Sequence, residues 1–176
     1  FREFEGYGNQ KNFGASLAEH DWIVNLDDDE LPSTSLLNHL CQWKKPDPNT
    51  RALRIRRINF CNGSAVSWGK WNDDYSTRIY HTSCQWDDRL LHESLIVPKH
   101  EMQTIQWPLY HLTANHFDNY LKKTKEYRSK RAASLGGKRH VGWSTLKTLF
   151  SSLVYLEWLE GVNGLYLTLT RSLERN

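Results

Sequence analysis

The chain has 176 residues, of which 39% are hydrophobic and 24% are charged, and its formal net charge at pH 7 is +3. This composition supports one hydrophobic core of ordinary size, so we expect one domain or part of one. No apolar run approaches the roughly 20 residues of a membrane-spanning helix, so none is predicted. The three cysteines are odd in number and lack metal-site spacing, which favours a reducing, cytoplasmic compartment.

Charged residues are distributed unevenly along the chain. Acidic residues gather at Asp27–Glu30 and between Asp73 and Asp88, whereas basic residues crowd residues 122–139. A basic segment on a mixed chain indicates contact with a polyanion, either an anionic membrane surface or a nucleic acid. A solvated helix face is an equally good interpretation of the same run.

The first elements alternate between helix and strand. Phe13, Leu17 and Ala18 have helical spacing and predict a helix over residues 10–19, followed by a buried strand over 22–26. Pro32 and Ser33 begin a second helix, which ends before the break at 46–48. A helix followed by a strand suggests an α/β protein.

The middle of the chain predicts several strands. Residues 52–60 alternate imperfectly, which is typical of a half-exposed strand with a bulge, and residues 62–64 form a turn. Residues 76–81 predict another short strand. The run 105–112 is also strand-like, but Pro108 places it at a sheet edge.

From residue 113 onward the pattern is helical. One helix with a basic face ends at Gly136, and two amphipathic segments follow at about 143–159 and 165–173. Trp143, Phe150, Tyr155 and Trp158 lie among leucines in this region. Such a surface could lie in a lipid headgroup layer or pack against the sheet, and both interpretations stay open.

The acidic run LDDDE closes the predicted strand 22–26. Carboxylates this close raise each other's pKa, so a cation is their natural partner, and Asp oxygens suit Mg²⁺ or Mn²⁺. On extended backbone Asp27 and Asp29 project to the same side, with Asp29 the stronger metal candidate, whereas Asp28 faces solvent. The alternative is a solvated acidic turn before a helix, with Asp29 or Ser33 as its cap.

The series GYGNQKN, W-I and LDDDE resembles the central part of glycosyltransferase family 2, especially the branch that adds a sugar to the inner core of bacterial lipopolysaccharide. Residues 89–93, RLLHE, resemble that branch's V-H-E segment, and Tyr110-His111 with the following basic helix resembles its later portion. The matching residues of the first series are Gly6, Tyr7, Gly8, Gln10, Lys11, Asn12, Trp22, Ile23, Leu26, Asp27, Asp29 and Glu30.

The resemblance implies an α/β fold of the GT-A type, a Rossmann-like nucleotide-diphospho-sugar transferase fold. Residues 1–112 would be the catalytic part and residues 113–176 a basic, amphipathic helical region. The family's first βαβ unit, which holds the nucleotide base, has no counterpart in front of Phe1, so we expect an N-terminally truncated fragment that is inactive on its own. The family also has a small residue where this chain has Asp28.

The implied reaction is inverting, metal-dependent transfer of a hexose, with UDP-glucose as the expected donor. It needs a base for the acceptor hydroxyl and a Lewis acid for the departing diphosphate. We assign the base to Glu93, with Asp88 as second choice, and the metal to Asp27 and Asp29, with His111 as a further ligand. Gln10 and Lys11, with the same two aspartates, would bind the donor.

The expected acceptor is a lipopolysaccharide core or another glycolipid, reached at the cytoplasmic face of the bacterial inner membrane through peripheral contact, with no nucleic acid as partner. A second hypothesis is a non-catalytic module that binds anionic lipid or nucleic acid through the basic helix.

Overall fold

The computed structural model describes residues 3–43, 47, 49–69, 71–89, 93–114 and 141–175, and it is a mixed α/β structure. The helices are α1 (Tyr7–Ser16), α2 (Thr34–Gln42), α4 (Val141–Val154) and α5 (Val162–Arg175), with 3-10 turns η1 (Lys99–Glu101) and η2 (Glu157–Glu160). The strands are β1 (Trp22–Val24), β2 (Glu30–Pro32), β3 (Ala52–Cys61), β4 (Ser64–Ala65), β5 (Asp74–His81), β6 (Gln85–Trp86), β7 (Leu95–Ile96) and β8 (Met102–Ala114). The α/β prediction is confirmed at this level.

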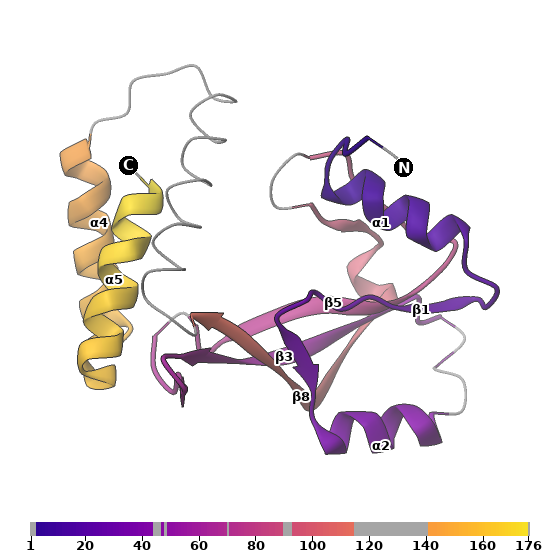
Figure 1. Ribbon diagram of the computed structural model, residues 1–176, viewed down its shortest axis with the longest axis horizontal. Helices are drawn as coiled ribbons and strands as arrows, with labels where there is room; N and C mark the ends of the chain where they lie inside the picture. The colour runs from indigo at the N-terminus through magenta and orange to yellow at the C-terminus, as the bar shows by residue number, and fades with distance from the viewer. Residues whose placement is uncertain are drawn as a thin grey trace. The chain divides into compact units, whose positions relative to one another are not determined.

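Most strands join one sheet in the order β1-β5-β3-β8-β2, with β4 pairing to β3 (Figure 1). Strand β1 runs antiparallel to β5, with Trp22 opposite His81 and Val24 opposite Ile79. A separate antiparallel pair, β6–β7, places Trp86 opposite Leu95. The described strands therefore form one sheet and a separate, small β6–β7 pair.

By spatial contacts the chain divides into two compact units. Unit 1 comprises residues up to 57 and 75–109, and unit 2 comprises residues 58–74 and 110 onward. The predicted division of the chain at residue 112 into catalytic and helical domains stays a prediction.

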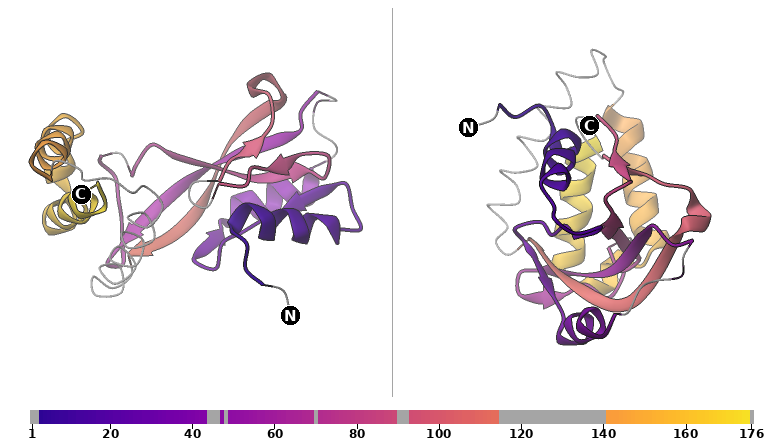
Figure 2. Two further views of the ribbon diagram at one scale, coloured as in Figure 1. Left: turned by 90° about the horizontal axis from the view of Figure 1, so that it is seen from above. Right: turned by 90° about the vertical axis from the view of Figure 1, so that its right-hand side faces the viewer.

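In unit 1 the sheet is covered on both faces. Helix α2 inserts Leu36 into a cluster with Leu53, Ile55, Ile79, Ile105 and Leu109. The opposite face buries Ala52 and Tyr80 against Trp86 and Leu95 of the β6–β7 pair, with Ala15 of α1 alongside. Figures 1 and 2 show α1 and α2 on opposite sides of the sheet. Alternation along β3 sends Ala52 and Leu53 to these opposite faces.

Helix α2 and the hairpin after β3 form for the reasons that the sequence indicates. Ser33 caps α2 by accepting a hydrogen bond from the backbone N–H of Leu36 at 3.1 Å. Asn62 and Gly63 have φ values of 49° and 78°, which suits a two-residue hairpin turn between β3 and β4. The predicted cap, turn and strands in this region are confirmed.

Helix α1 was predicted for the wrong reason. Its bounds are Tyr7–Ser16 rather than 10–19, and the apolar residues Phe13 and Leu17 are 37% and 67% exposed. The helix is held instead by polar contacts of Lys11 and Asn12, given below. The strand that was predicted to be buried is β1. Its Val24 is half exposed, because β1 is an end strand of the sheet.

The edge placement of the strand with Pro108 is wrong. Strand β8 lies between β3 and β2, and the carbonyl of Pro108 accepts a hydrogen bond from Ser33 at 3.2 Å. Proline lacks only the N–H donor, so a neighbour that needs its carbonyl can still pair there. Here the neighbour is Ser33, which directly follows the short strand β2 and whose N–H uses the Pro108 carbonyl.

In unit 2, α4 and α5 lie side by side (Figures 1 and 2). Leu167 of α5 packs with Cys61 and Val66. Both helices correspond to the predicted amphipathic segments, with the break at residues 155–161. The predicted basic helix begins at residue 113, but residues 113 and 114 belong to strand β8, so its start is wrong. The rest of it, up to Gly136, lies outside the described residues.

Within the described part of the chain, no helix combines the length and apolarity needed to cross a bilayer.

Candidate functional site

The acidic run forms a closed turn rather than an extended segment. The backbone N–H of Glu30 donates to the carbonyl of Asp27 at 3.1 Å, and the N–H of Asp27 donates to the Glu30 carboxylate at 3.1 Å. Strand alternation therefore does not place Asp27 and Asp29 on one side, because alternation holds only on extended backbone and this run is a turn. Their common side stays a prediction. Asp28 is exposed, as predicted.

Arginines supply the positive charge at this turn. Arg78 of β5 donates to Glu30 at 2.7 Å and also pairs with Asp27, and Arg57 of β3 donates to Glu30 at 3.1 Å. The Glu30 side chain is fully buried and that of Arg78 is 4% exposed. A buried carboxylate is tolerated only when it is paired and hydrogen-bonded. Glu30 therefore serves the fold of this turn.

A divalent ion at this turn would have Asp27 and Asp29 as its protein ligands. Mg²⁺ often binds through one or two carboxylates together with substrate phosphates, so a pair is chemically sufficient. The Asp27 side chain is 40% exposed but already paired with Arg78. Among the described residues, no group of three His, Cys, Asp or Glu side chains could hold a metal. The metal site stays a prediction that depends on ligand oxygens from a substrate.

His111 lies in a polar network of unit 2. Its Nδ1 is 2.6 Å from Oδ1 of Asn59 and 2.7 Å from the Thr113 hydroxyl. Asn59 also donates to Asp74 at 2.9 Å and to the carbonyl of Trp71 at 2.7 Å. These contacts give His111 a structural role, and its assignment as a metal ligand stays a prediction.

The second acidic position, Glu93, is brought together with Lys11. Their side chains are 2.7 Å apart although 82 residues separate them in the sequence, and they are 15% and 13% exposed. The ammonium of Lys11 also lies 4.3 Å from the ring centroid of Trp86. Two predicted site residues from the GYGNQKN and RLLHE segments thus meet in one ion pair.

Helix α1 is fixed to β6 by the residue after Lys11 and by a glycine. The Asn12 side chain accepts from the N–H of Trp86 at 2.8 Å and donates to its carbonyl at 2.9 Å, as a neighbouring strand would. A Cβ on Gly8 would lie 1.9 Å from the carbonyl oxygen of Asp87, so only glycine allows this approach. Gly8, Lys11 and Asn12 of the motif therefore all act on the segment that leads to Glu93.

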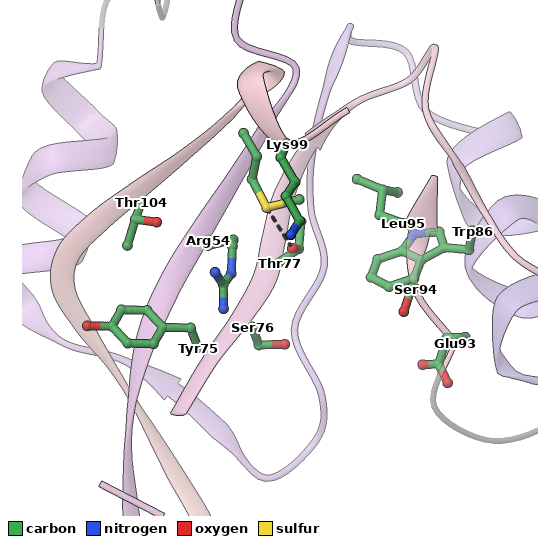
Figure 3. Close-up of a pocket in the computed structure, with 11 residues that line it drawn as sticks. Arg54, Tyr75, Ser76, Thr77, Trp86, Glu93, Ser94, Leu95, Lys99 and Thr104 are labelled. Atoms are coloured by element: carbon green, nitrogen blue, oxygen red, sulfur yellow. Dashed lines mark hydrogen bonds between the residues drawn. The ribbon is translucent and has the colours of Figure 1, made fainter. Parts of the chain in front are cut away.

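Glu93 lines a pocket of about 630 Å³ on the α1 side of the sheet (Figure 3). Arg54, Tyr75 and Thr104 lie on one side, and Trp86, Glu93 and Leu95 lie on the other (Figure 3). The remaining lining residues are Ser76, Thr77, Ser94, Lys99 and Met102. The volume falls within the roughly 300–1,000 Å³ typical of small-molecule sites.

The other predicted residues of this region are exposed. Gln10 and Asp88 lie at the surface. Asp87, next to Asp88, is held by Arg89 at 2.7 Å and by the N–H of Ser94 at 3.1 Å. The hydrogen bond from Arg89 lowers the pKa of Asp87, and the Ser94 N–H adds to this effect. Asp87 is thus a carboxylate that is fixed by hydrogen bonds from Arg89 and Ser94.

Sequence reasoning missed the arginine partners and the basic residues of the pocket. Arg57 and Arg78 lie inside strands, where a charged side chain needs a partner, and this was the available signal. Arg54 could have been found as the exposed residue between buried Leu53 and Ile55. Nothing in the local sequence of Lys99 points to the pocket.

A scan of the chain against models of known protein families finds no match. Function is therefore inferred from the motif residues and from the geometry of Glu93 and its pocket.

Proposed function

We propose that this chain is the catalytic part of an inverting glycosyltransferase of the GT-A type. The observation that supports the proposal most is the Lys11–Glu93 ion pair at 2.7 Å on the wall of a pocket of about 630 Å³. Residues of two separate motif segments converge there, which a chance resemblance of short motifs does not predict. The transferred hexose is glucose, from a nucleotide diphosphate sugar.

In this proposal Glu93 is the general base. The acceptor hydroxyl attacks the anomeric carbon of the donor sugar, its proton passes to the Glu93 carboxylate, and the bond from that carbon to the diphosphate oxygen breaks. The diphosphate leaves with the bonding electron pair, and the anomeric configuration inverts. Lys11 holds the carboxylate oriented and supplies its counter-charge.

The donor's diphosphate is assigned to the acidic turn. Asp27 and Asp29 would hold Mg²⁺ or Mn²⁺, which stabilises the negative charge of the leaving diphosphate when it is bound. Arg78 would then exchange one of its two carboxylate partners, since Glu30 keeps it in place. Gln10 and His111 stay secondary candidates for donor and metal contacts.

The acceptor is proposed to be a lipopolysaccharide core or similar glycolipid at the cytoplasmic face of the bacterial inner membrane. Support comes from exposed apolar side chains of α4, η2 and α5, among them Phe150 at 70%, Trp158 at 57% and Leu165 at 61% exposed. Such side chains suit a headgroup layer. Core packing against other parts of the protein would also explain them.

The test is donor binding by the full-length protein. We expect UDP and UDP-glucose to raise the melting temperature only with Mn²⁺ or Mg²⁺, and Asp29→Asn to remove this effect while the apo protein melts unchanged. Asp28→Asn is the matched control and should keep the effect. Equal protection without a metal, or in Asp29→Asn, would remove the metal assignment.

The alternative, a non-catalytic module for anionic lipid or nucleic acid, predicts a different result. Its binding would fall steeply with salt and would not respond to Mn²⁺ or UDP-glucose. That pattern, with no transfer to any glycolipid acceptor, would refute the transferase proposal.

A further inference from the structure

The pocket beside Glu93 carries positive charge from two lining residues, Arg54 and Lys99. Glu93 is also a lining residue, but its charge is offset by Lys11. Among the residues that the structure describes, neither Arg54 nor Lys99 forms an ion pair with a carboxylate. Unpaired cations beside a concave surface attract anionic ligands.

Arg54 is held in a defined position. Its guanidinium carbon lies 5.4 Å from the ring centroid of Tyr75, in a cation–π contact. This contact with the ring is not a hydrogen bond of the guanidinium N–H groups, and their planar fork matches phosphate or carboxylate oxygens. Figure 3 shows Arg54 on the Tyr75 side of the pocket and Lys99 between that side and the side of Leu95 and Trp86.

The aromatic residues of the pocket are not open platforms for a neutral sugar. Tyr75 is covered by Arg54, and Trp86 is covered by Lys11 at 4.3 Å and is only 6% exposed. Stacking of a sugar ring on these faces is thereby restricted. The lining instead offers hydroxyl groups from Ser76, Thr77, Ser94 and Thr104, which can bond to sugar hydroxyls.

We infer that this pocket is an acceptor subsite for an acidic saccharide, a sugar that carries a phosphate or a carboxylate. Arg54 and Lys99 bind the anionic group, and the hydroxyl-bearing side chains and Glu93 face the sugar. The role as acceptor subsite rests on the proposed function, because it places the attacking hydroxyl next to Glu93. Binding of the acidic sugar itself does not depend on it.

The experiment measures binding to the full-length protein by calorimetry, without donor or metal. The probes are glucose 6-phosphate, glucuronate, the neutral methyl glucoside and inorganic phosphate. We expect an acidic sugar to bind more tightly than the neutral sugar and than phosphate alone, and Arg54→Gln or Lys99→Gln to weaken it about tenfold, as loss of one charge-assisted contact does. Arg54→Lys should give a smaller loss, since the charge remains without the planar fork.

The matched control is Arg51→Gln, which removes another exposed cation, one that pairs with Glu101 and does not line the pocket. Preference for glucose 6-phosphate or for glucuronate identifies the anion, and either supports the inference. No binding of any acidic sugar, equal affinity for the neutral sugar or for inorganic phosphate, or a loss in Arg51→Gln as large as in Arg54→Gln would overturn it.

The two proposals fail separately. Acidic sugar bound through Arg54 and Lys99, with no transfer from any nucleotide sugar, leaves the subsite and refutes the transferase. Transfer that depends on Glu93, with Arg54→Gln unaffected in acceptor binding, refutes the subsite alone.

Discussion

The acidic turn and the Glu93 region hold their carboxylates in different ways. At the turn, the Glu30 side chain is fully buried and accepts hydrogen bonds from Arg78 and Arg57. These two arginines neutralise its charge within the fold. Glu93 is 15% exposed, has one lysine partner and borders a pocket. Glu30 of the acidic run is therefore structural, whereas Glu93 lies beside a pocket, where the proposed base is expected.

The largest expected effect is on turnover in Glu93→Gln. Loss of a general base lowers kcat by about 10² to 10⁴-fold, whereas sugar binding should persist because the amide keeps the side-chain shape. The measurement is glycosyl transfer by the full-length protein. Glu101→Gln is the control, since Glu101 pairs with exposed Arg51 and is not one of the residues that line the pocket. If Asp88→Asn shows the loss instead, the base was misassigned.

The next effect is on stability in Arg78→Met. Removing one partner of a buried ion pair costs about 3–5 kcal/mol, because Glu30 stays buried with less positive charge beside it. The free energy of unfolding, measured with urea, should fall by this amount, whereas Arg89→Met at an exposed pair should leave it nearly unchanged.

A double variant sharpens this comparison. Glu30→Leu combined with Arg78→Met removes both charges and should recover part of the loss, since apolar residues can replace a buried pair. If the single and double variants are equally unstable, packing rather than charge holds the turn together.

A smaller effect tests how α1 controls the Glu93 segment. Gly8→Ala forces a Cβ against the backbone of Asp87, so we expect a loss of about 1–3 kcal/mol in stability together with reduced turnover. Gly14→Ala lies on the same helix with no heavy atom within 4 Å of the new Cβ, and it should stabilise by about 0.5–1 kcal/mol. Equal behaviour of the two variants would contradict the close approach at Gly8.

Local patterns predicted the elements that local physics determines. Ser33 begins α2 as a cap, Asn62 and Gly63 form the hairpin turn, and Leu53 and Ile55 face one core, all as their residue types indicate. These outcomes depend on near neighbours in sequence. The wrong edge placement of β8 shows the limit, because strand order depends on pairing with β2, which is distant in sequence.

The sequence predicts candidate site residues one by one, but it does not predict which residues contact one another. Lys11 and Glu93 were both named, yet nothing between them in sequence indicates that they would meet. The acidic run predicts a positive partner of some kind, but Arg78 lies 48 residues from Glu30, so the sequence does not show that an arginine takes this place. Long-range pairing of charges is decided by the sheet, which brings β3 and β5 side by side.

The smallest expected effect concerns Asp87. Its carboxylate is fixed by the nearby residues Arg89 and Ser94. Arg89 lowers the pKa of Asp87 below its ordinary value of 3.8, so Arg89→Gln should move that pKa back toward 3.8 in a carboxyl NMR titration. Because the folded-state pKa is the lower one, the stabilisation from Asp87 is present above about pH 4 and is lost as the pH falls through the folded-state pKa.

A second variant, Asp87→Asn, tests whether Asp87 or Glu93 is the base. Asp87 does not line the pocket beside Glu93, so Asp87→Asn should remove the contact with the Ser94 N–H and leave the proposed base in place. An unchanged pKa of Asp87 in Arg89→Gln would mean that the Ser94 N–H alone holds the carboxylate. A turnover loss in Asp87→Asn as large as that in Glu93→Gln would indicate that Asp87 also takes part in the reaction. The contrast between a structural Asp87 and a reactive Glu93 would then be wrong.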